Sequence, residues 1–307
     1  MTMADQKGWI WMDGAWVPWQ EAKVHVLTHS LHYGMGIFEG LRAYDTDRGA
    51  AIFRLEEHTH RFIQSARALN MAMPFTEAAL NAAQKEIVVR NELKTAYVRP
   101  LGFYGAEGMG IRAENLKMHV SIAAWHWGAY MGEEGLEKGI KVATAATRKL
   151  SIQSQFPKVK ATGHYINSML ALSEAIRADC AEALLLDPDG YVAEGSGENI
   201  FLVKQGVLYT PTPTHCLKGI TRDTIFVLAK DLGISVVETL LTREDVYLAD
   251  EAFFTGTAAE ITPVRMVDGR SIGNGGRGPL TQKLQSLYFD IVHGRVPAYA
   301  HWCHLVS

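Results

Sequence analysis

The sequence predicts an α+β protein of two domains, and three observations support this. The chain has 307 residues, which is long enough to form two cores of ordinary size. Short apolar stretches with strand character alternate with segments whose apolar residues recur at helical spacing. These segments form no regular βα series, and Gly195-Ser-Gly197 lacks the third glycine of a dinucleotide fingerprint, so a doubly wound sheet is disfavoured.

The first part of the chain mixes strands and helices. Two aromatic stretches, 9–11 and 16–17, flank Asp13-Gly14, which is a strong hairpin pattern. A second turn is expected between 38–44 and 51–53. Further along, the apolar spacing predicts helices over 56–70 and 77–91 and buried strands over 96–104 and 118–125.

A glycine-rich, charged run begins at Gly128 and predicts a linker. We therefore expect a first domain over 1–128, a linker over 129–139 and a second domain over 140–307. In the second domain Thr221 stands where it could cap a helix. The expected elements are strands over 140–144, 183–186, 236–240, 251–254 and 262–267, and helices over 164–178, 221–232 and 280–293.

Composition limits the classes of function. The formal net charge is −3, so the chain has no basic excess to neutralise a nucleic-acid backbone. Cys180, Cys216 and Cys303 are odd in number and far apart, which disfavours a disulfide framework and fits a reducing compartment. The polar N-terminus resembles no signal peptide, and no apolar run is long enough to span a bilayer. The sequence predicts a cytoplasmic protein without nucleic-acid or membrane partners.

Histidines and common motifs give little support for other chemistries. The sequence has no P-loop and no Gly-x-Ser-x-Gly elbow. His25, His29 and His32 could mimic metal ligands on one helical face, but their surroundings suit a strand that passes into a turn. We therefore predict no metal, and a metal-binding protein stays an alternative from a different class. His58 and His60 are expected to be solvated.

Polar residues flanked by glycines stand out in four segments, 160–165, 194–201, 219–223 and 256–260. A helix start near Gly219 would offer N–H groups and a positive dipole end to a phosphate. Each residue also has a simpler interpretation: Lys160 as a surface lysine, Thr221 as an N-cap, and Arg61 as the partner of Glu57. Composition and spacing alone thus indicate a two-domain enzyme that binds a phosphate.

The run from Glu194 to Arg222 resembles the motif of fold-type-IV aminotransferases. It contains Glu194, Asn199-Ile-Phe201, Leu208-x-Thr210 and Leu217-x-Gly219-Ile-x-Arg222 at that family's spacing. Other runs, at 32–42, 96–100, 108–111, 127–130 and 256–264, resemble bacterial branched-chain amino acid aminotransferases. The resemblance implies a smaller N-terminal α/β domain and a larger C-terminal pseudo-barrel domain that carries the cofactor lysine.

The same resemblance implies pyridoxal 5'-phosphate as the cofactor. Lys160 would hold the cofactor as a Schiff base and, once freed, would carry the reacting proton. Glu194 would keep the pyridine nitrogen protonated, and Tyr165 would donate a hydrogen bond to the ring oxygen. The residues implied for the phosphate are Arg61, Ile220, Thr221 and Thr257.

The implied reaction is transamination of Leu, Ile and Val with 2-oxoglutarate, so one pocket must take both an apolar side chain and a carboxylate. Tyr97 and Arg99 would provide for the carboxylate, and Gly40 would leave room. The N–H groups of Thr257 and Ala258 would take the α-carboxylate. The implied apolar wall consists of Phe38, Trp127, Tyr130 and Tyr165, with Tyr33 and Ile111 reaching in from a neighbouring subunit.

Residues supplied by a partner imply a homodimer as the minimum, and a homohexamer stays open. His164 and the polar run 148–158 depart from the family pattern, which affects the substrate range and not the cofactor. The tail 296–307 matches no motif. Other fold-type-IV reactions stay alternatives, namely D-amino acid or R-selective amine transamination and the aminodeoxychorismate lyase reaction, as does a non-catalytic ligand-binding relative.

Overall fold

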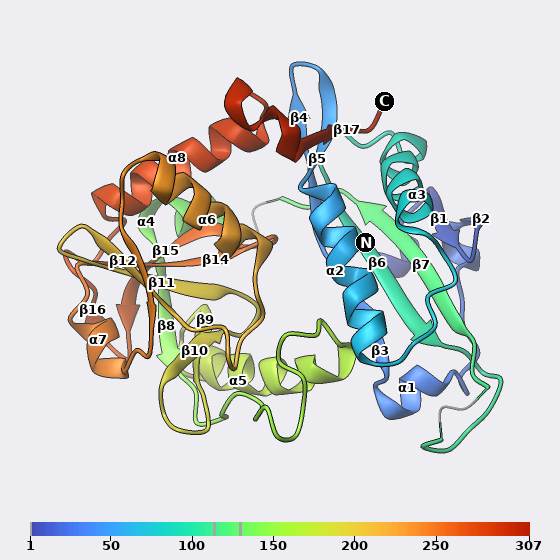
Figure 1. Cartoon of the computed structure of the whole chain (residues 1–307), viewed down its shortest axis with the longest axis horizontal. Helices are drawn as coiled ribbons and strands as arrows, with labels where there is room; N and C mark the ends of the chain where they lie inside the picture. The colour runs from blue at the N-terminus through green and yellow to red at the C-terminus, as the bar shows by residue number, and fades with distance from the viewer. Residues whose placement is uncertain (1, 113–114, 129–130) are drawn as a thin grey trace. The chain divides into compact units, whose positions relative to one another are not determined.

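The computed structural model describes residues 2–112, 115–128 and 131–307, and the chain divides into two compact units (Figure 1). Unit 1 comprises Met1–Trp127, Val159–Gly163 and Asp290–Ser307. Unit 2 comprises Gly128–Lys158 and His164–Phe289. Each unit combines helices with a β-sheet, as the predicted α+β class requires.

The units differ from the predicted ranges 1–128 and 140–307, because two later segments join unit 1. The segment around Lys160 is tied to the first part of the chain by backbone hydrogen bonds: the Phe38 N–H donates to the Lys160 carbonyl at 3.1 Å, and the Gly163 N–H donates to the Gly34 carbonyl, also at 3.1 Å. The tail joins through a strand. The order of residues along the chain does not show that these later segments pack with the first part of the chain.

Unit 1 is built on an antiparallel sheet with the order β17-β5-β4-β6-β7-β1-β2, and β3 pairs with β6. Asp13 and Gly14 adopt positive φ of 50° and 90°, which allows the tight turn of the predicted β1–β2 hairpin. The strands are β1 (Trp9–Met12), β2 (Ala15–Pro18), β3 (Gly36–Phe38), β4 (Leu41–Thr46), β5 (Gly49–Phe53), β6 (Ala96–Tyr104), β7 (Met118–Trp125) and β17 (Cys303–Leu305).

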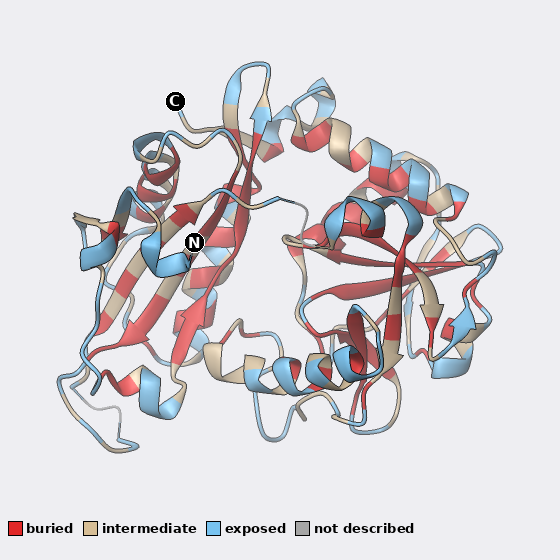
Figure 2. Cartoon of the chain, turned by 180° about the vertical axis from the view of Figure 1, so that it is seen from behind, coloured by how far each residue is buried: buried red, intermediate tan, exposed pale blue. Residues whose placement is uncertain are grey.

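Helices α2 (Leu55–Ala68) and α3 (Glu77–Arg90) contact each other and pack against this sheet (Figure 1). Phe62 of α2 and Ile87 of α3 are buried in one cluster with Val98 and Ile122 of the sheet. Figure 2 shows that the strands of this sheet are largely buried. The apolar spacing of the two helices therefore builds the core that fixes α2 in place.

Unit 2 contains a mixed sheet with the order β10-β9-β8-β15-β14-β11-β12-β13, and β16 pairs with β15. The sheet is curled, and the Val192 N–H of one edge strand donates to the Leu241 carbonyl just beyond the other edge at 2.7 Å. Its strands are β8 (Ile140–Thr144), β9 (Glu182–Leu186), β10 (Val192–Gly195), β11 (Asn199–Lys204), β12 (Val207–Pro211), β13 (Val236–Thr239), β14 (Glu251–Gly256), β15 (Glu260–Val267) and β16 (Arg270–Ser271). This is the predicted pseudo-barrel.

The helices of unit 2 surround this sheet. They are α4 (Gly132–Lys138), α5 (Tyr165–Arg177), α6 (Ile220–Asp231), α7 (Arg243–Tyr247) and α8 (Pro279–Val292). Helix α5 contacts β8 and β9, and α6 contacts β13 and β14. In the part of the chain described here, no helix is long and apolar enough to cross a membrane.

Three local expectations were wrong, and one unassigned segment proved to have structure. The expected linker contains α4, whose acidic first turn and Lys138 in the last turn suit the helix dipole. His29 lies in a short helix, α1 (His29–Tyr33), and not in a strand that enters a turn. Helix α6 begins one residue earlier than expected, so its N-cap is Gly219 and not Thr221. The unassigned tail forms β17, which pairs with β5.

Candidate active site

Lys160 is held between β3 and α2 of unit 1. Its carbonyl accepts a hydrogen bond from the Phe38 N–H, and its own N–H donates to Oγ of Ser65 at 3.3 Å. The Nζ atom lies 4.8 Å from the centre of the Phe38 ring. The simpler interpretation of Lys160 as a surface lysine was therefore wrong.

The amine of Lys160 is more acidic than that of an ordinary lysine. Burial disfavours the charged form, and the neighbouring Arg61 guanidinium acts in the same direction, so the pKa falls from 10.5 to about 8. A larger fraction of the amine is unprotonated near neutral pH than in a solvated lysine. The side chain is thus suited to act as a nucleophile and to accept and return a proton.

A buried carboxylate, Glu39, lies at the end of β3 and was missed by the sequence-based predictions. It accepts hydrogen bonds from Arg61 Nε at 2.6 Å, Arg61 Nη2 at 2.9 Å and His58 Nδ1 at 2.7 Å. Glu57, the partner that the simpler interpretation gave to Arg61, pairs with Arg54. His58 is 2% exposed, so its expected solvation was wrong, whereas His60 is exposed.

Five residues predicted to bind substrate gather on adjoining strands of the same unit. Arg99 Nη2 donates to Tyr97 Oη at 3.2 Å, and the guanidinium lies 4.8 Å from the Phe38 ring centre. A Cβ on Gly40 would lie 1.9 Å from Tyr97 Oη, so only glycine fits there. The Trp127 ring lies 4.5 Å from the Tyr97 ring. Buried Nε of Arg99 has no hydrogen-bond partner among the described residues.

Tyr33 and Ile111 lie together on the surface of unit 1. Their exposed fractions are 43% and 89%, and the Gly110 N–H donates to Tyr33 Oη at 3.2 Å. Such exposure suits residues that contact another molecule. Tyr130, the remaining predicted wall residue, lies outside the described residues.

Glu194, on β10 of unit 2, is 6% exposed and surrounded by donors. Lys149 Nζ lies 2.5 Å from its Oε1. Its Oε2 accepts hydrogen bonds from Asn199 Nδ2 and from the Leu217 N–H, each at 3.2 Å. Burial alone would lower the pKa of Lys149, but the facing carboxylate of Glu194 outweighs this and raises it. Glu194 is therefore held in place by three donors.

The first turn of α6 contains Ile220 and Thr221, both buried. A Cβ on the N-cap Gly219 would lie 2.1 Å from Asn199 Oδ1, so β11 fixes the position of this helix start. The first-turn N–H groups of a helix have no partner within it, and the dipole there favours an anion. The remaining predicted residues of unit 2 are placed at element ends: Tyr165 at the start of α5, and Thr257 and Ala258 in the turn between β14 and β15.

Two further buried carboxyl groups, Glu182 and Glu198, support the loop that follows Glu194. Glu182 Oε1 accepts from the Ser196 N–H at 3.1 Å, and Glu198 Oε2 accepts from the Gly197 N–H at 3.0 Å. Burial raises the pKa of both groups, and the charge of Glu182 raises that of Glu198 further, so that Glu198 lies well above the usual range. The pair therefore retains a proton where isolated carboxyls would be ionised.

The histidines offered as an alternative metal site serve local structure. His29 Nε2 bonds to the Gly110 carbonyl at 2.7 Å, and His32 Nε2 bonds to the Val26 carbonyl at 2.9 Å. Within residues 2–112, 115–128 and 131–307, no group of three or more potential ligands could hold a metal ion.

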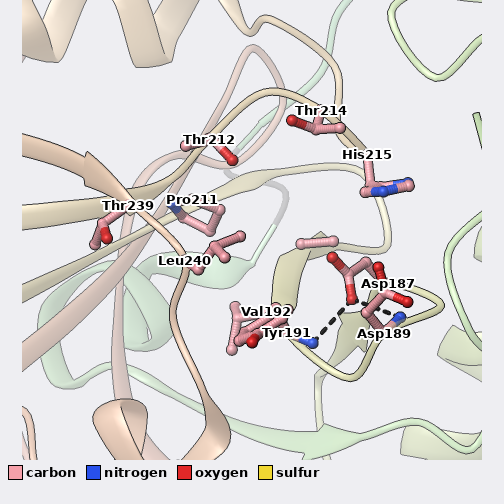
Figure 3. Close-up of a pocket in the computed structure, with 11 residues that line it drawn as sticks. Asp187, Asp189, Tyr191, Val192, Pro211, Thr212, Thr214, His215, Thr239 and Leu240 are labelled. Atoms are coloured by element: carbon pink, nitrogen blue, oxygen red, sulfur yellow. Dashed lines mark hydrogen bonds between the residues drawn. The ribbon is translucent and has the colours of Figure 1, made fainter.

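Unit 2 also contains a separate hollow of about 170 Å³. Figure 3 shows Asp187 at its rim, where Oδ1 accepts hydrogen bonds from the backbone N–H groups of Asp189 at 3.0 Å and Tyr191 at 2.8 Å. The carboxylate is thereby used to hold the turn between β9 and β10. None of the residues that line the hollow belongs to the predicted site.

The fold and the residue clusters around Lys160 and Glu194 can be compared with those of known proteins. The family described as "Amino-transferase class IV" matches residues 36–267. The chain therefore belongs to the class IV aminotransferases.

Named relatives narrow this class. The chain is 58% identical over 307 residues to the branched-chain-amino-acid aminotransferase of Pseudomonas aeruginosa, covering 100% of both chains. It is 44% identical over 301 residues to the enzyme of the same name from Escherichia coli K12, covering 97% of each. These matches confirm the prediction of an enzyme of the branched-chain aminotransferase type.

Solved structures agree with this assignment. The branched-chain amino acid aminotransferase of Escherichia coli has a TM-score of 0.96 at 44% identity, with 98% of this chain and 100% of that chain covered. The enzyme of the same name from Thermobaculum terrenum, solved in its PLP-bound holo-form, has a TM-score of 0.92 at 33% identity, with 98% and 99% covered. The predicted fold type and the predicted cofactor, pyridoxal 5'-phosphate, are thereby confirmed.

Proposed function

We propose that the chain transfers the amino group of branched-chain L-amino acids (Leu, Ile, Val) to 2-oxoglutarate, with pyridoxal 5'-phosphate bound to Lys160 as a Schiff base. The observation that carries the proposal is the buried Lys160 amine with its lowered pKa, beside the Arg99 guanidinium and the Phe38 ring. A reactive amine, a cation and an aromatic wall are what this two-substrate reaction requires. The names of the relatives support the substrate class.

The residues present fit the cofactor. When bound, its protonated ring withdraws electrons from the reacting carbon. Glu194 would hold the proton on the ring nitrogen, and Tyr165 would donate to the ring oxygen. Lys160 would hold the cofactor and, once the substrate amine has displaced it, its free amine would move the proton. The phosphate would be held by the Arg61 guanidinium, the helix start at Ile220 and Thr221, and Thr257.

The substrate residues divide into two sets. Phe38, Trp127, Tyr130 and Tyr165 would form an apolar wall for a branched side chain. Gly40 leaves room for the Tyr97 hydroxyl, since a Cβ at this position would lie 1.9 Å from Tyr97 Oη. Arg99, oriented by Tyr97, would bind the distal carboxylate of glutamate. The N–H groups of Thr257 and Ala258 would hold the α-carboxylate that all substrates share.

A homodimer is the proposed minimum active unit, with the homohexamer still open. Tyr33 and Ile111 are exposed, and Leu31 and Val26 beside them are 66% and 73% exposed. Such an apolar surface suits contact with a second copy whose pocket it completes. Sedimentation of the purified protein tests this, since a monomer with full activity would exclude it. The cytoplasmic location stays a prediction.

The reaction is tested by product analysis. Leucine and 2-oxoglutarate together should yield 4-methyl-2-oxopentanoate and glutamate over many turnovers, and when one substrate is omitted no product should exceed one equivalent of the enzyme. Pyruvate released from an aminodeoxychorismate substrate without an amino acceptor would indicate the lyase reaction instead. Turnover of D-amino acids or of amines lacking a carboxylate, without turnover of leucine, would contradict the proposed substrate class.

A further inference from the structure

Glu39 brings two side chains of α2 to one carboxylate. His58 and Arg61 are three residues apart, so they project from the same face of the helix. Arg61 donates Nε to Oε1 at 2.6 Å and Nη2 to Oε2 at 2.9 Å, while His58 Nδ1 bonds to Oε2 at 2.7 Å. Glu39 is 0% and His58 2% exposed, whereas the Arg61 side chain is 16% exposed, so the carboxylate and the imidazole are closed to solvent and the guanidinium is not fully so.

The charges of this network are fixed by its surroundings. Burial would raise the pKa of Glu39, but the Arg61 guanidinium and His58 hold it well below the usual range. Burial lowers the pKa of His58 despite the pull of Glu39, so the imidazole is neutral near pH 7 and donates through Nδ1. The network is therefore one ion pair oriented by one neutral donor.

The two parallel bonds from Arg61 fix the plane of its guanidinium, which a single contact would leave free to rotate. A long arginine side chain otherwise loses considerable rotamer entropy when it binds an anion. A guanidinium that is already held in its binding orientation loses less rotamer entropy, so Arg61 binds an anion more tightly than a freely rotating arginine would. The cost of the arrangement is a fully buried charge pair, which is not by itself a reliable source of stability.

We propose that Glu39 and His58 are positioning residues that hold the Arg61 guanidinium in the orientation required to bind the cofactor's phosphate group. This inference rests on the proposed function, because it assumes that the phosphate belongs to pyridoxal 5'-phosphate. Neither residue touches the cofactor in this account, and both act through Arg61.

The experiment compares two ligands on the full-length protein after the cofactor has been removed. Pyridoxal 5'-phosphate and pyridoxal differ only in the phosphate. Glu39→Gln keeps the volume of the side chain and removes its charge. We expect its Kd for pyridoxal 5'-phosphate to rise about 10- to 100-fold, the usual effect of losing a partner that orients a binding group. Its Kd for pyridoxal should change less than about twofold.

His58 offers a matched pair of variants. His58→Asn keeps an N–H near the position of Nδ1 and should retain most of the phosphate-dependent affinity, whereas His58→Leu should lose it. Arg61→Met should lose the same affinity, and adding Glu39→Gln to Arg61→Met should cause no further loss. Retained pyridoxal binding shows in each case that the protein is folded.

Two results would overturn the inference. One is equal weakening of pyridoxal and pyridoxal 5'-phosphate in Glu39→Gln and His58→Leu, which would assign the network a purely structural role. The other is wild-type affinity for pyridoxal 5'-phosphate in both variants. Failure of the wild-type protein to bind pyridoxal 5'-phosphate would instead refute the proposed function. If Glu39→Gln does not fold, the comparison of His58→Asn with His58→Leu decides the matter alone.

Discussion

Lys149 and Glu194 form a buried ion pair, with Nζ 2.5 Å from Oε1 and side chains only 11% and 7% exposed. Lys149 belongs to the polar run 148–158, which the sequence analysis expected to affect the substrate range. The pair gives Lys149 a role of its own, because it places a cation against a carboxylate that is buried from water.

Loss of this cation should destabilise the fold. Breaking a buried pair costs about 3–5 kcal/mol, because one charge stays buried alone. Lys149→Met should therefore lower the free energy of unfolding by about 3 kcal/mol in urea denaturation of the protein without cofactor, and Lys149→Arg by much less. The exposed pair of Lys138 and Glu134 provides the control, since Lys138→Met should cost under about 1 kcal/mol. Similar small losses in both methionine variants would disprove this role.

Replacement of Arg99 should lower the activity towards substrates with a distal carboxylate and leave the activity towards leucine nearly unchanged. Arg99→Met should reduce kcat/KM for glutamate and 2-oxoglutarate roughly 10- to 100-fold, since a hydrogen bond to a charged group contributes about 1.5–3 kcal/mol. The kcat/KM for leucine should change little, because leucine has no distal carboxylate. Steady-state assays in which one substrate is varied at a time measure each kcat/KM, and the exposed Arg295→Met serves as the control. An equal fall for leucine would show that Arg99 serves the α-carboxylate or the fold.

The lowered pKa of Lys160 has a consequence for stability in the absence of the cofactor. The unfolded chain holds this proton up to about pH 10.5 and the folded chain only to about pH 8. The folding penalty is therefore complete below pH 8 and fades as the pH rises from 8 to 10.5. Lys160→Met should stabilise the protein by roughly 2–3 kcal/mol at pH 7 and by much less at pH 9.5. Denaturation of both proteins across this range measures the difference.

The exposed Lys138→Met again serves as control and should show no such dependence on pH. A stabilisation by Lys160→Met that is the same at pH 7 and 9.5 would mean that side-chain packing, and not the protonation of Lys160, causes it.

The Glu182 and Glu198 pair predicts the opposite dependence on pH. Burial raises both pKa values, and the charge of Glu182 raises that of Glu198 further, so the folded protein holds a proton that the unfolded chain releases. Stability from this source is present below pH 4.5 and is lost as the pH rises through the folded pKa. Glu198→Gln should therefore raise Tm by a few degrees at pH 8 and less at pH 5. Glu21 is exposed, so Glu21→Gln should not change Tm in this way and serves as the control. A lower Tm of Glu198→Gln at pH 8 would argue that Glu198 is ionised in the folded protein.

Much of the fold could be predicted because its signals are local. The β6 and β7 strands agree with the predicted ranges to the residue, and the Asp13-Gly14 turn specifies its hairpin. Helix α1 and strand β17 could not be predicted, because they are short and depend on the segments against which they lie. The return of Lys160 to unit 1 depends on backbone hydrogen bonds to Gly34 and Phe38, which no local pattern reveals.

The candidate site was predictable where a family motif names residues, as at Lys160 and Glu194. The partners of these residues were not, because Glu39, His58 and Lys149 look like ordinary polar residues in sequence. Only burial and distance show that each completes an ion pair or hydrogen bond. One signal could have indicated the network: His58 and Arg61 have helical spacing, and Glu39 lies directly before Gly40, a predicted site residue.

Reduction of the purified enzyme with borohydride tests the central claim most directly. We predict that the absorbance band of the bound cofactor disappears and that peptide mapping by mass spectrometry finds the reduced cofactor on Lys160 alone. Lys160→Ala should show no covalent product and almost no transamination. A label on another lysine, or wild-type transamination by Lys160→Ala, would contradict the account.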